Sequence, residues 1–423
     1  MADESAAPPY NFVPSAGPGC HLCHGAPSLV PWLVGWEDYD PRDYGLDEEE
    51  EEDEEGEEGG GIPEIALDPD HLTVSVTNAS ADRRMCYVTV FDVPCRGRDG
   101  RSLLQGRTTV EAAAIEDAQA VTDGEDGGGG NGGSERDGGE EAAISRRCTT
   151  FVVLCPPRTF VHLCTLDLPP GTALSDVEID SDVREYVPHP DPADEHPAAD
   201  LGFPLRRTMG HEEGGEEEGS EDDGGAGRGR RRRQLRGRGG EGFLCTQGEG
   251  GHLTHHLLGN HHAVDFRCPV GTPVVAVADG TVVQATDSCG MTGIAVGNLF
   301  RWNSVMLRLD SHEDGDDGDG APLYVEYVHI QRGSLLVGEG NRVRRGQELC
   351  RSGGVGFSPE PHLHFSAFRS EEPTAPTVRV RFRAEGGCGE DRLFLPRAGL
   401  RYDERGLVEG GEGDEEVGEA GRS

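Results

Sequence analysis

The sequence predicts a mainly β protein with two folded regions, set in long acidic, glycine-rich disordered segments. Apolar residues alternate with a period of two in several short runs, which is typical of half-buried strands. Glycine contributes 64 of the 423 residues, and only 34% of the residues are hydrophobic. A chain of this composition cannot bury a core along its whole length, so parts of it are expected to stay unstructured.

Residues 62–187 are expected to form a small N-terminal β-sandwich. Several short strands with turn residues between them are typical of this architecture. The candidate strands are Leu72–Thr77, Cys86–Val90, Phe151–Leu154, Phe160–Cys164 and Val177–Asp180. A disordered insert at about 111–141, rich in glycine and acidic residues, is expected to loop out of the sandwich.

Residues 243–388 are expected to form a second unit, a glycine-turned β barrel or sandwich. Two apolar runs, 274–278 and 281–283, flank Asp279-Gly280, which favours a hairpin. The runs 305–309 and 324–330 are expected to pair around an acidic loop at 313–319. This unit holds 12 Arg against 17 acidic residues, so it is close to neutral.

The net charge of −41 therefore belongs mainly to the segments predicted to be disordered, 1–61, 188–242 and 389–423. A chain this acidic is not expected to bind nucleic acid. The Arg-rich run 228–238 leaves two interpretations open: a patch for nuclear localisation or RNA contact, or a solvated linker. Residues 1–5 lack the features of a signal peptide, and no apolar run is long enough to span a membrane. We therefore expect a cytoplasmic protein with reduced thiols.

The basic residues are all Arg, and the absence of Lys excludes Schiff-base, P-loop and lipoyl- or biotinyl-carrier chemistry. Cys20-His-Leu-Cys23-His24 has the form of a haem-attachment motif, but it lies in a Pro/Gly-rich stretch. A haem is not expected there; a zinc site with a distant partner and a chance pattern both remain open. Trp32 and its aromatic neighbours could form a short docking segment.

The strongest chemical signal is His362-Leu363-His364 in a strand-like context. Residues i and i+2 of a strand point to the same face, so both imidazoles are expected on one side. His261 and Asp265 stand four residues apart about a hundred residues earlier, and His329 lies between the two motifs. Histidine is the commonest transition-metal ligand and a proton carrier near neutral pH, so the pattern favours a metal-dependent site.

These motifs resemble those of the lysostaphin-like zinc metalloendopeptidases. The resemblance covers roughly 130 residues and rests on four segments in the same order as in that family. They are Asn260–Phe266 followed by the Gly-Thr-Pro-Val and Ala-Asp-Gly runs at 271–280, Tyr327–Ile330, Val343–Ser358, and Pro361–Phe365. The resemblance implies the duplicated hybrid-motif fold, an architecture related to the lipoyl and biotinyl barrels, for the C-terminal unit.

The resemblance also implies a site with one catalytic Zn²⁺. It gives His261, Asp265 and His364 as the metal ligands, His362 as general base, and His329, if protonated, as the stabiliser of the developing oxyanion. Three protein ligands would leave a position for water, as in catalytic zinc sites. One departure from the family's HxGxD motif is Ala263 in place of glycine.

The family substrate is a peptidoglycan peptide, so metal-assisted peptide hydrolysis is the function that the resemblance implies. A non-catalytic zinc-containing module that recognises glycans or proteins is the alternative. His255 and His256 precede the HxxxD motif closely. The spacing selects His261 as the ligand, and we expect His255 and His256 to be loop residues near the cleft.

Overall fold

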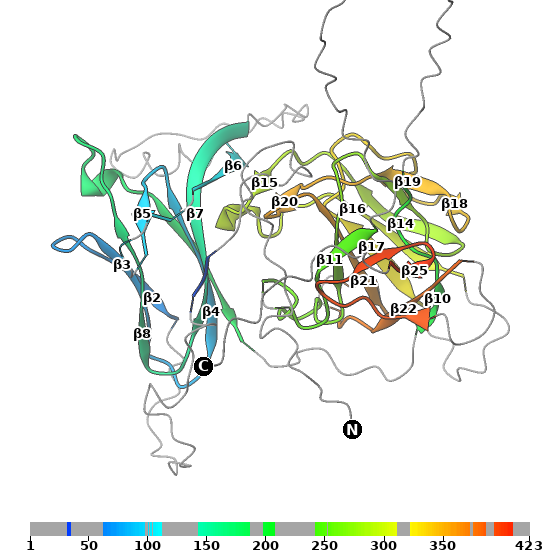
Figure 1. Cartoon of the computed structure of the whole chain (residues 1–423), viewed down its shortest axis with the longest axis horizontal. Coiled ribbons are helices and arrows are strands. Elements are labelled where there is room, and N and C mark those ends of the chain that lie inside the picture. Colours follow the sequence, from blue (N-terminus) through cyan, green and yellow to red (C-terminus); the bar gives the residue numbers. More distant parts are fainter. Residues whose placement is uncertain are drawn as a thin grey trace, which may run out of the picture.

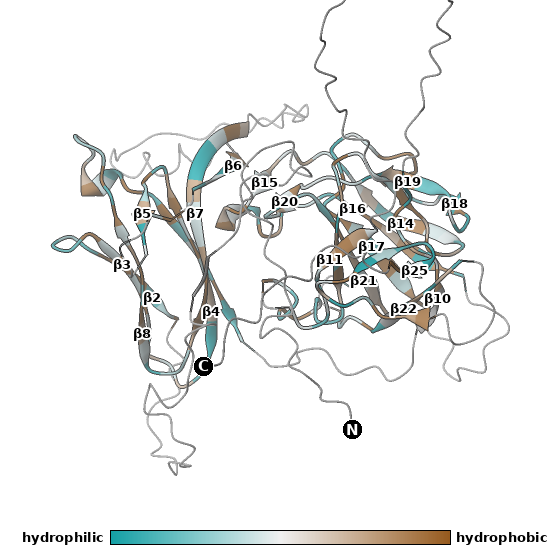
Figure 2. Ribbon diagram, viewed as in Figure 1, coloured by the Kyte–Doolittle hydropathy of each residue, from teal (hydrophilic) through white to brown (hydrophobic). Residues whose placement is uncertain are grey.

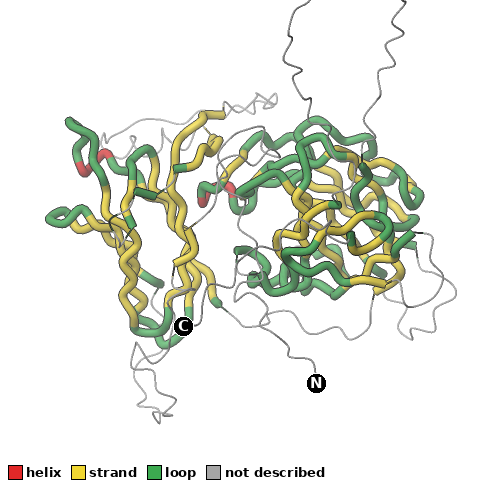
Figure 3. Tube along the Cα trace, viewed as in Figure 1, coloured by secondary structure: helices red, strands yellow, loops and turns green. Residues whose placement is uncertain are grey.

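The computed structural model confirms the mainly β fold. It describes residues 32–34, 62–97, 100, 102–103, 105–111, 143–186, 198–207, 242–251, 253–310, 322–372, 375–385 and 393–408. Strands dominate this part of the chain, with two 3-10 turns at Leu174–Asp176 and Val296–Asn298 (Figure 3). None of the helices in these ranges is long and apolar enough to cross a membrane.

The N-terminal lobe is a β-sandwich of two sheets (Figure 1). One sheet contains, in spatial order, β2 (Glu64–Asp68), β3 (Thr73–Asn78), β8 (Thr159–Leu166) and β5 (Cys95–Arg96). The other contains β9 (Ile179–Glu185), β4 (Arg84–Phe91), β7 (Ala143–Cys155) and β6 (Gly106–Glu111). Inward-facing residues such as Val76, Val88, Phe151 and Leu163 fill the space between the sheets and hold them together.

The C-terminal lobe is built on one large antiparallel sheet. Its spatial order is β18 (Arg342–Val343), β14 (Gly280–Thr286), β16 (Ser304–Leu309), β17 (Tyr324–Val328), β21 (His362–Phe368), β12 (Val264–Arg267), β11 (Phe243–Gln247), β24 (Arg401–Asp403) and β25 (Gly406–Leu407). Hydrophobic stretches recur along strands of both lobes (Figure 2), and central strands such as β4, β12 and β21 are buried on both faces. The strands β16 and β17 pair as the sequence predicts.

Smaller sheets complete this lobe and differ from the sequence-based expectation. The strand β13 (Pro273–Val275) pairs with β19 (Glu348–Arg351), so the hairpin expected around Asp279-Gly280 does not form. Asp279 instead accepts a hydrogen bond from the backbone of Arg345, at 2.7 Å, which draws the turn towards the 345 loop. A long-range pairing thus overrides the local turn signal.

The lobe also recruits residues from segments predicted to be disordered. The strand β10 (Ala198–Leu201) pairs with β22 (Val380–Arg383), which pairs with β23 (Leu393–Phe394), while β24 and β25 extend the large sheet. Leu201, Phe203 and Leu205 are buried in the main core. These few apolar residues are enough to order their stretch of chain, although the composition around them predicts disorder. The strand β1 (Trp32–Val34), which lies in the N-terminal tail predicted to be disordered, pairs with β7 of the sandwich.

The two lobes are joined by a shared sheet and a shared core. The strand β6 of the sandwich pairs with β15 (Thr292–Gly293), which pairs with β20 (Gly356–Phe357) of the C-terminal lobe. Met85, Tyr87 and Phe91 of β4 belong to the same buried apolar cluster as Leu253 and Phe357. The sandwich is therefore packed directly against loops of the C-terminal lobe (Figure 1). The Cys20 motif, His252, the 112–142 insert and the Arg-rich run lie outside the described residues.

Candidate active site

Three neighbouring strands bring four of the five predicted site residues together. The strand β21 lies between β12 and β17, with Asp265 opposite His364 on one side and Val328 opposite His364 on the other. His362 and His364 share a face of β21, as the period of a strand requires. His329 follows β17 directly, and its ring centroid lies 4.5 Å from that of His362.

Asp265, His364 and a third residue, His255, form a compact buried cluster. The Nε2 atom of His255 lies 3.2 Å from Oδ1 of Asp265 and 3.2 Å from Nδ1 of His364, and the last two atoms are 2.9 Å apart. The exposed fraction is 0% for His255, 4% for Asp265 and 6% for His364. Two ligand atoms on a tetrahedral zinc, each about 2.0–2.1 Å from it, stand about 3.3 Å apart. The spacing and the two-histidine, one-carboxylate composition of the cluster therefore fit a zinc ion.

Hydrogen bonds around this cluster orient its imidazoles. The Nδ1–H group of His255 donates to the carbonyl of Gly248, at 2.8 Å, which leaves the lone pair of Nε2 facing the cluster. Nε2 of His364 lies 2.9 Å from the hydroxyl of Ser366, so Nδ1 is the atom presented to Asp265. Metal-ligating histidines commonly use their second nitrogen in this way.

The Asp265 carboxylate is held ionised. Burial raises its pKa, but the charges of His255 and His362, with hydrogen bonds from His255 and His364, outweigh burial and bring the pKa well below its ordinary value. The side-chain amide of Gln247 also donates to Oδ2 of Asp265, at 2.8 Å. A buried anion thus faces imidazole nitrogens that either carry a proton or give it up to bind a metal ion, which is an environment that favours a positive charge.

His362 and His329 border this cluster with their own nitrogens fixed. The Nδ1–H of His362 donates to the carbonyl of Glu360, at 2.8 Å, and the Nδ1–H of His329 donates to the carbonyl of Val355, at 2.6 Å. Burial, followed by the nearby imidazoles of His362 and His364, lowers the pKa of His329 well below its ordinary value. His329 is therefore neutral in the resting protein, with Nε2 as an acceptor.

The backbone at His329 is in the left-handed region, with φ of 63°. Few non-glycine residues adopt this conformation, and such strain is concentrated at functional sites. Gly353 makes room for it, since a Cβ at that position would come within 2.9 Å of the His329 carbonyl oxygen. The conformation aims the imidazole at His362 rather than along the strand.

His261 is where the structure differs from the predicted ligand set. It belongs to a second group, with Glu249 and His262, and not to the group formed by Asp265 and His364. The carbonyl of His261 accepts from the backbone of Gly250, at 2.8 Å, and a turn closes between Ala263 and Asn260. These bonds tie His261 to the Glu249 side, and His255, expected to be only a loop residue near the cleft, takes the third place beside Asp265.

The second group also contains a cation. Arg379 forms an ion pair with Glu249, and Nδ1 of His262 lies 3.3 Å from Oε1 of the same carboxylate. Burial raises the pKa of Glu249, while His262 and Arg379 lower it more strongly, to about 2. The carboxylate is therefore already neutralised by Arg379, which makes this group a poorer cation site than the first.

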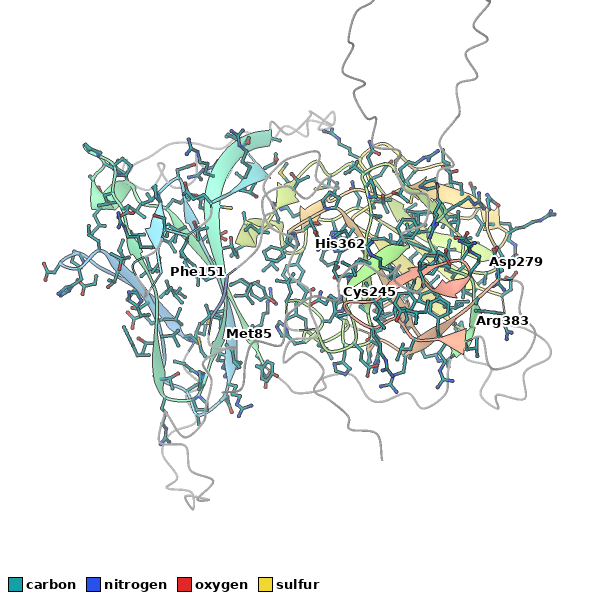
Figure 4. The ribbon with its side chains drawn as sticks, in the orientation of Figure 1. Met85, Phe151, Cys245, Asp279, His362 and Arg383 are labelled. Carbon is teal, nitrogen blue, oxygen red and sulfur yellow. The ribbon has the colours of Figure 1, made fainter. Side chains whose placement is uncertain are left out.

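A pocket opens beside His362 and His329. It is lined by polar residues that include Asp265, Thr254 and Glu360, and by the apolar residues Leu253 and Phe357. Glu360 is buried with Arg267, whose guanidinium lies 2.7 Å away. His362 lies on the side of the C-terminal lobe that faces the sandwich (Figure 4).

Two residues of this site carry no motif signal in the sequence. Gln247, at the end of β11, is fully buried and links Asp265 to the loop that carries His255. Tyr87, in the sandwich, contacts the same loop. For His255 the only signal is its place in a histidine-rich stretch; for the other two there is none, because their role depends on contacts that are remote in sequence.

Comparisons with known proteins identify a family for part of the chain. Residues 259–376 match the model of peptidase family M23. The glycyl-glycine endopeptidase ALE-1 of Staphylococcus capitis is 38% identical over 107 residues, 25% of this chain and 24% of that protein. An uncharacterised metalloprotease of Haemophilus influenzae is 34% identical over 149 residues, 35% of this chain and 26% of that protein.

A third relative is the peptidoglycan DD-endopeptidase ShyC of Vibrio cholerae, 33% identical over 105 residues, 25% of this chain and 19% of that protein. The chain thus spans about a fifth to a quarter of the length of these relatives. The match contains Asp265, His329, His362 and His364, the residues that the strands bring together. Residues 259–376 of this chain form a domain of peptidase family M23.

Proposed function

We propose that this protein is a zinc-dependent metalloendopeptidase that hydrolyses peptide bonds in peptidoglycan peptides. The observation that carries the proposal is the convergence of three buried side chains able to hold a metal ion beside two histidines whose Nε2 atoms act as acceptors. The substrate class follows from the relatives, two of which are named for cleaving glycyl-glycine bonds and peptidoglycan.

His255, Asp265 and His364 would hold the zinc ion, and His261 would not. A bound zinc supplies an acidified water and polarises the scissile carbonyl. Three ligands leave room for that water in a tetrahedral site. This ligand set differs from the one implied by the HxxxD spacing only in having His255 in place of His261, since Asp265 and His364 belong to both sets.

His362 would act as the general base. Its Nδ1–H is held by the Glu360 carbonyl, so its Nε2 lone pair is directed to the pocket side, 3.8 Å from Oδ2 of Asp265. A water between these groups would lie within reach of Nε2, which takes its proton and later passes it to the leaving amine. Asp265 favours the imidazolium that forms in this step.

His329 would face the substrate carbonyl as it becomes tetrahedral. Neutral in the resting site, it accepts at Nε2 and donates only after it takes up a proton. A proton taken up from solvent would give His329 that donor as negative charge develops on the carbonyl oxygen, while the proton held by His362 goes to the leaving amine.

The test is hydrolysis by the full chain after zinc loading. Peptidoglycan and a pentaglycine peptide are incubated with the wild type and with His362→Ala, and newly released amino groups are measured. Release by the wild type and a loss of at least about a hundredfold in His362→Ala would support the base assignment, because general bases contribute about 10²–10⁴ in rate. No release from any substrate by the wild type would favour the non-catalytic binding module.

Metal analysis tests the ligand set independently. We expect His255→Ala to lose stoichiometric zinc and His261→Ala to retain it, with His364→Ala as the positive control for loss. The two histidines lie six residues apart and are both buried, at 0% and 5% exposure, so the substitutions are closely matched. Zinc retained by His255→Ala and lost from His261→Ala would restore the motif-based assignment.

A further inference from the structure

We propose that the N-terminal β-sandwich completes the metal site, and that Tyr87 is the positioning residue through which it does so. The inference rests on the proposed function, since it takes His255 as a zinc ligand. It gives the sandwich a role in the chemistry of the neighbouring domain, where otherwise it would be a separate module.

The first step is the loop that carries His255. Residues 253–263 contain turns and no strand, whereas Asp265 and His364 lie on paired strands. The cluster therefore joins two side chains fixed by a sheet to one side chain fixed only by how its loop is docked. Ordering a loop residue costs about 1–2 kcal/mol of backbone entropy, so the docking contacts decide whether His255 is in place.

On its own domain's side, the loop is held by Gln247. The Oε1 atom of Gln247 accepts from the backbone of Leu253 and Thr254, at 3.0 and 3.1 Å. Its amide group donates to the Thr254 hydroxyl and to Asp265. Gln247 thus sets the distance between the loop and the strand-borne ligands.

On the opposite side, the loop is held by Tyr87 of β4. The Tyr87 hydroxyl donates to the carbonyl of Leu253, at 2.7 Å, across 166 residues of sequence. Its ring stacks on that of His256, with centroids 6.4 Å apart and planes 13° apart. The carbonyl of residue 253 and the ring of residue 256 bracket His255, so one side chain of the sandwich fixes both ends of the ligand-bearing segment.

Tyr87 also contacts the other edge of the pocket. Its ring meets Phe357 of β20 edge-on, with centroids 5.8 Å apart. Phe357 precedes Ser358, whose hydroxyl lies 3.1 Å from Nδ1 of His362. Tyr87 is fully buried, and no part of the residue reaches solvent. Through Tyr87, the sandwich therefore contacts both the loop that carries His255 and the segment that leads to His362, and stabilises their positions.

We expect zinc affinity to fall when the contacts of Tyr87 with the loop are weakened. Metal binds the docked loop, so the apparent dissociation constant rises as the docked fraction falls. Tyr87→Phe keeps the ring and its packing and removes the hydroxyl, with its bond to Leu253 and its weaker 3.4 Å contact with Nε2 of His256. One such bond is worth a factor of about three to ten in the docking equilibrium, and we expect the zinc dissociation constant to rise by up to that factor.

The matched control is Thr150→Val. Thr150 lies on β7 of the same sandwich, and its hydroxyl donates to a backbone carbonyl of the other lobe, that of Ile294, at 2.7 Å. The variant removes the same kind of bond across the same interface, together with the 2.8 Å bond between Thr150 and Thr89 inside the sandwich, and it does not contact the 253–256 segment. We expect its zinc dissociation constant to stay within about twofold of the wild type, since sites without shared partners act independently.

The experiment uses the full chain and makes two measurements. Zinc affinity is measured by competition with a chromogenic chelator. Hydrogen exchange is measured on the metal-free protein. Faster exchange in residues 253–263 of Tyr87→Phe, but not of Thr150→Val, is the readout that general destabilisation would not produce. Equal effects of the two variants, or none from Tyr87→Phe, would overturn the inference. The variant His255→Ala separates the two proposals. If it binds zinc as tightly as the wild type, the proposed ligand set is wrong. If it loses zinc affinity but Tyr87→Phe binds zinc like the wild type, only the role of Tyr87 is wrong.

Discussion

Gln247→Leu is the perturbation that most directly probes how the site is assembled. Gln247 is fully buried at the end of β11, and its amide makes four hydrogen bonds, two to backbone N–H groups of the loop, one to Thr254 and one to Asp265. Leucine has a similar volume, a side chain one atom shorter, and no polar atoms. The substitution therefore removes the polar link between loop and strand with little change in packing.

The magnitude follows from those four bonds. Three of them are worth about 1 kcal/mol net each, and the bond to the Asp265 carboxylate is worth about 2 kcal/mol because the acceptor is charged, which gives about 5 kcal/mol in all. In a domain of this size about 1 kcal/mol corresponds to 2–4 °C, so we expect the melting temperature of the metal-free protein to fall by at least about 10 °C. Zinc affinity should fall with it, because the loop that carries His255 loses its anchor.

Thermal unfolding of the full chain without metal, followed by circular dichroism, measures this effect. Gln284→Leu is the control, since Gln284 is exposed on β14 and its loss should change stability by no more than about 0.5 kcal/mol. A melting temperature for Gln247→Leu that matches that of Gln284→Leu would refute the reasoning. It would mean that the loop does not depend on these bonds.

Two further predictions concern Glu249 and Gly353. Glu249 has its pKa lowered from 4.5 to about 2, so its contribution to stability is fully present above its unfolded pKa and is lost as the pH falls through its folded one. Glu249→Gln should therefore be less stable than the wild type at pH 6, with the gap closing between about pH 5 and pH 2; a gap that is constant with pH in urea unfolding would contradict this. Gly353→Ala should lower kcat by at least about tenfold while zinc content stays stoichiometric, because its Cβ would press on the His329 carbonyl. Loss of zinc in this variant, or an unchanged kcat, would show that Gly353 does not position His329.

Much of the fold could be predicted from the sequence because it follows from local periodicity. The alternation in the runs around Val74, Val88 and Val305 places strands where the structure has them. The predicted hairpin at Asp279-Gly280 fails because β13 finds a better partner in β19. Likewise the segment around Leu201 is ordered by partners remote in sequence, β22 on one side and the stretch around Val274 on the other, which a local composition cannot reveal.

The candidate site divides in the same way. The sequence by itself determined that His362 and His364 share a face, because a strand repeats every two residues, and it placed Asp265 and His329 in a histidine-rich, metal-dependent pattern. Only the tertiary structure decided which histidine completes the cluster. A loop has no period to predict where its side chains point, so the choice of His255 over His261 depends on Gln247 and Tyr87, whose contacts form only when the strands and the two lobes have come together.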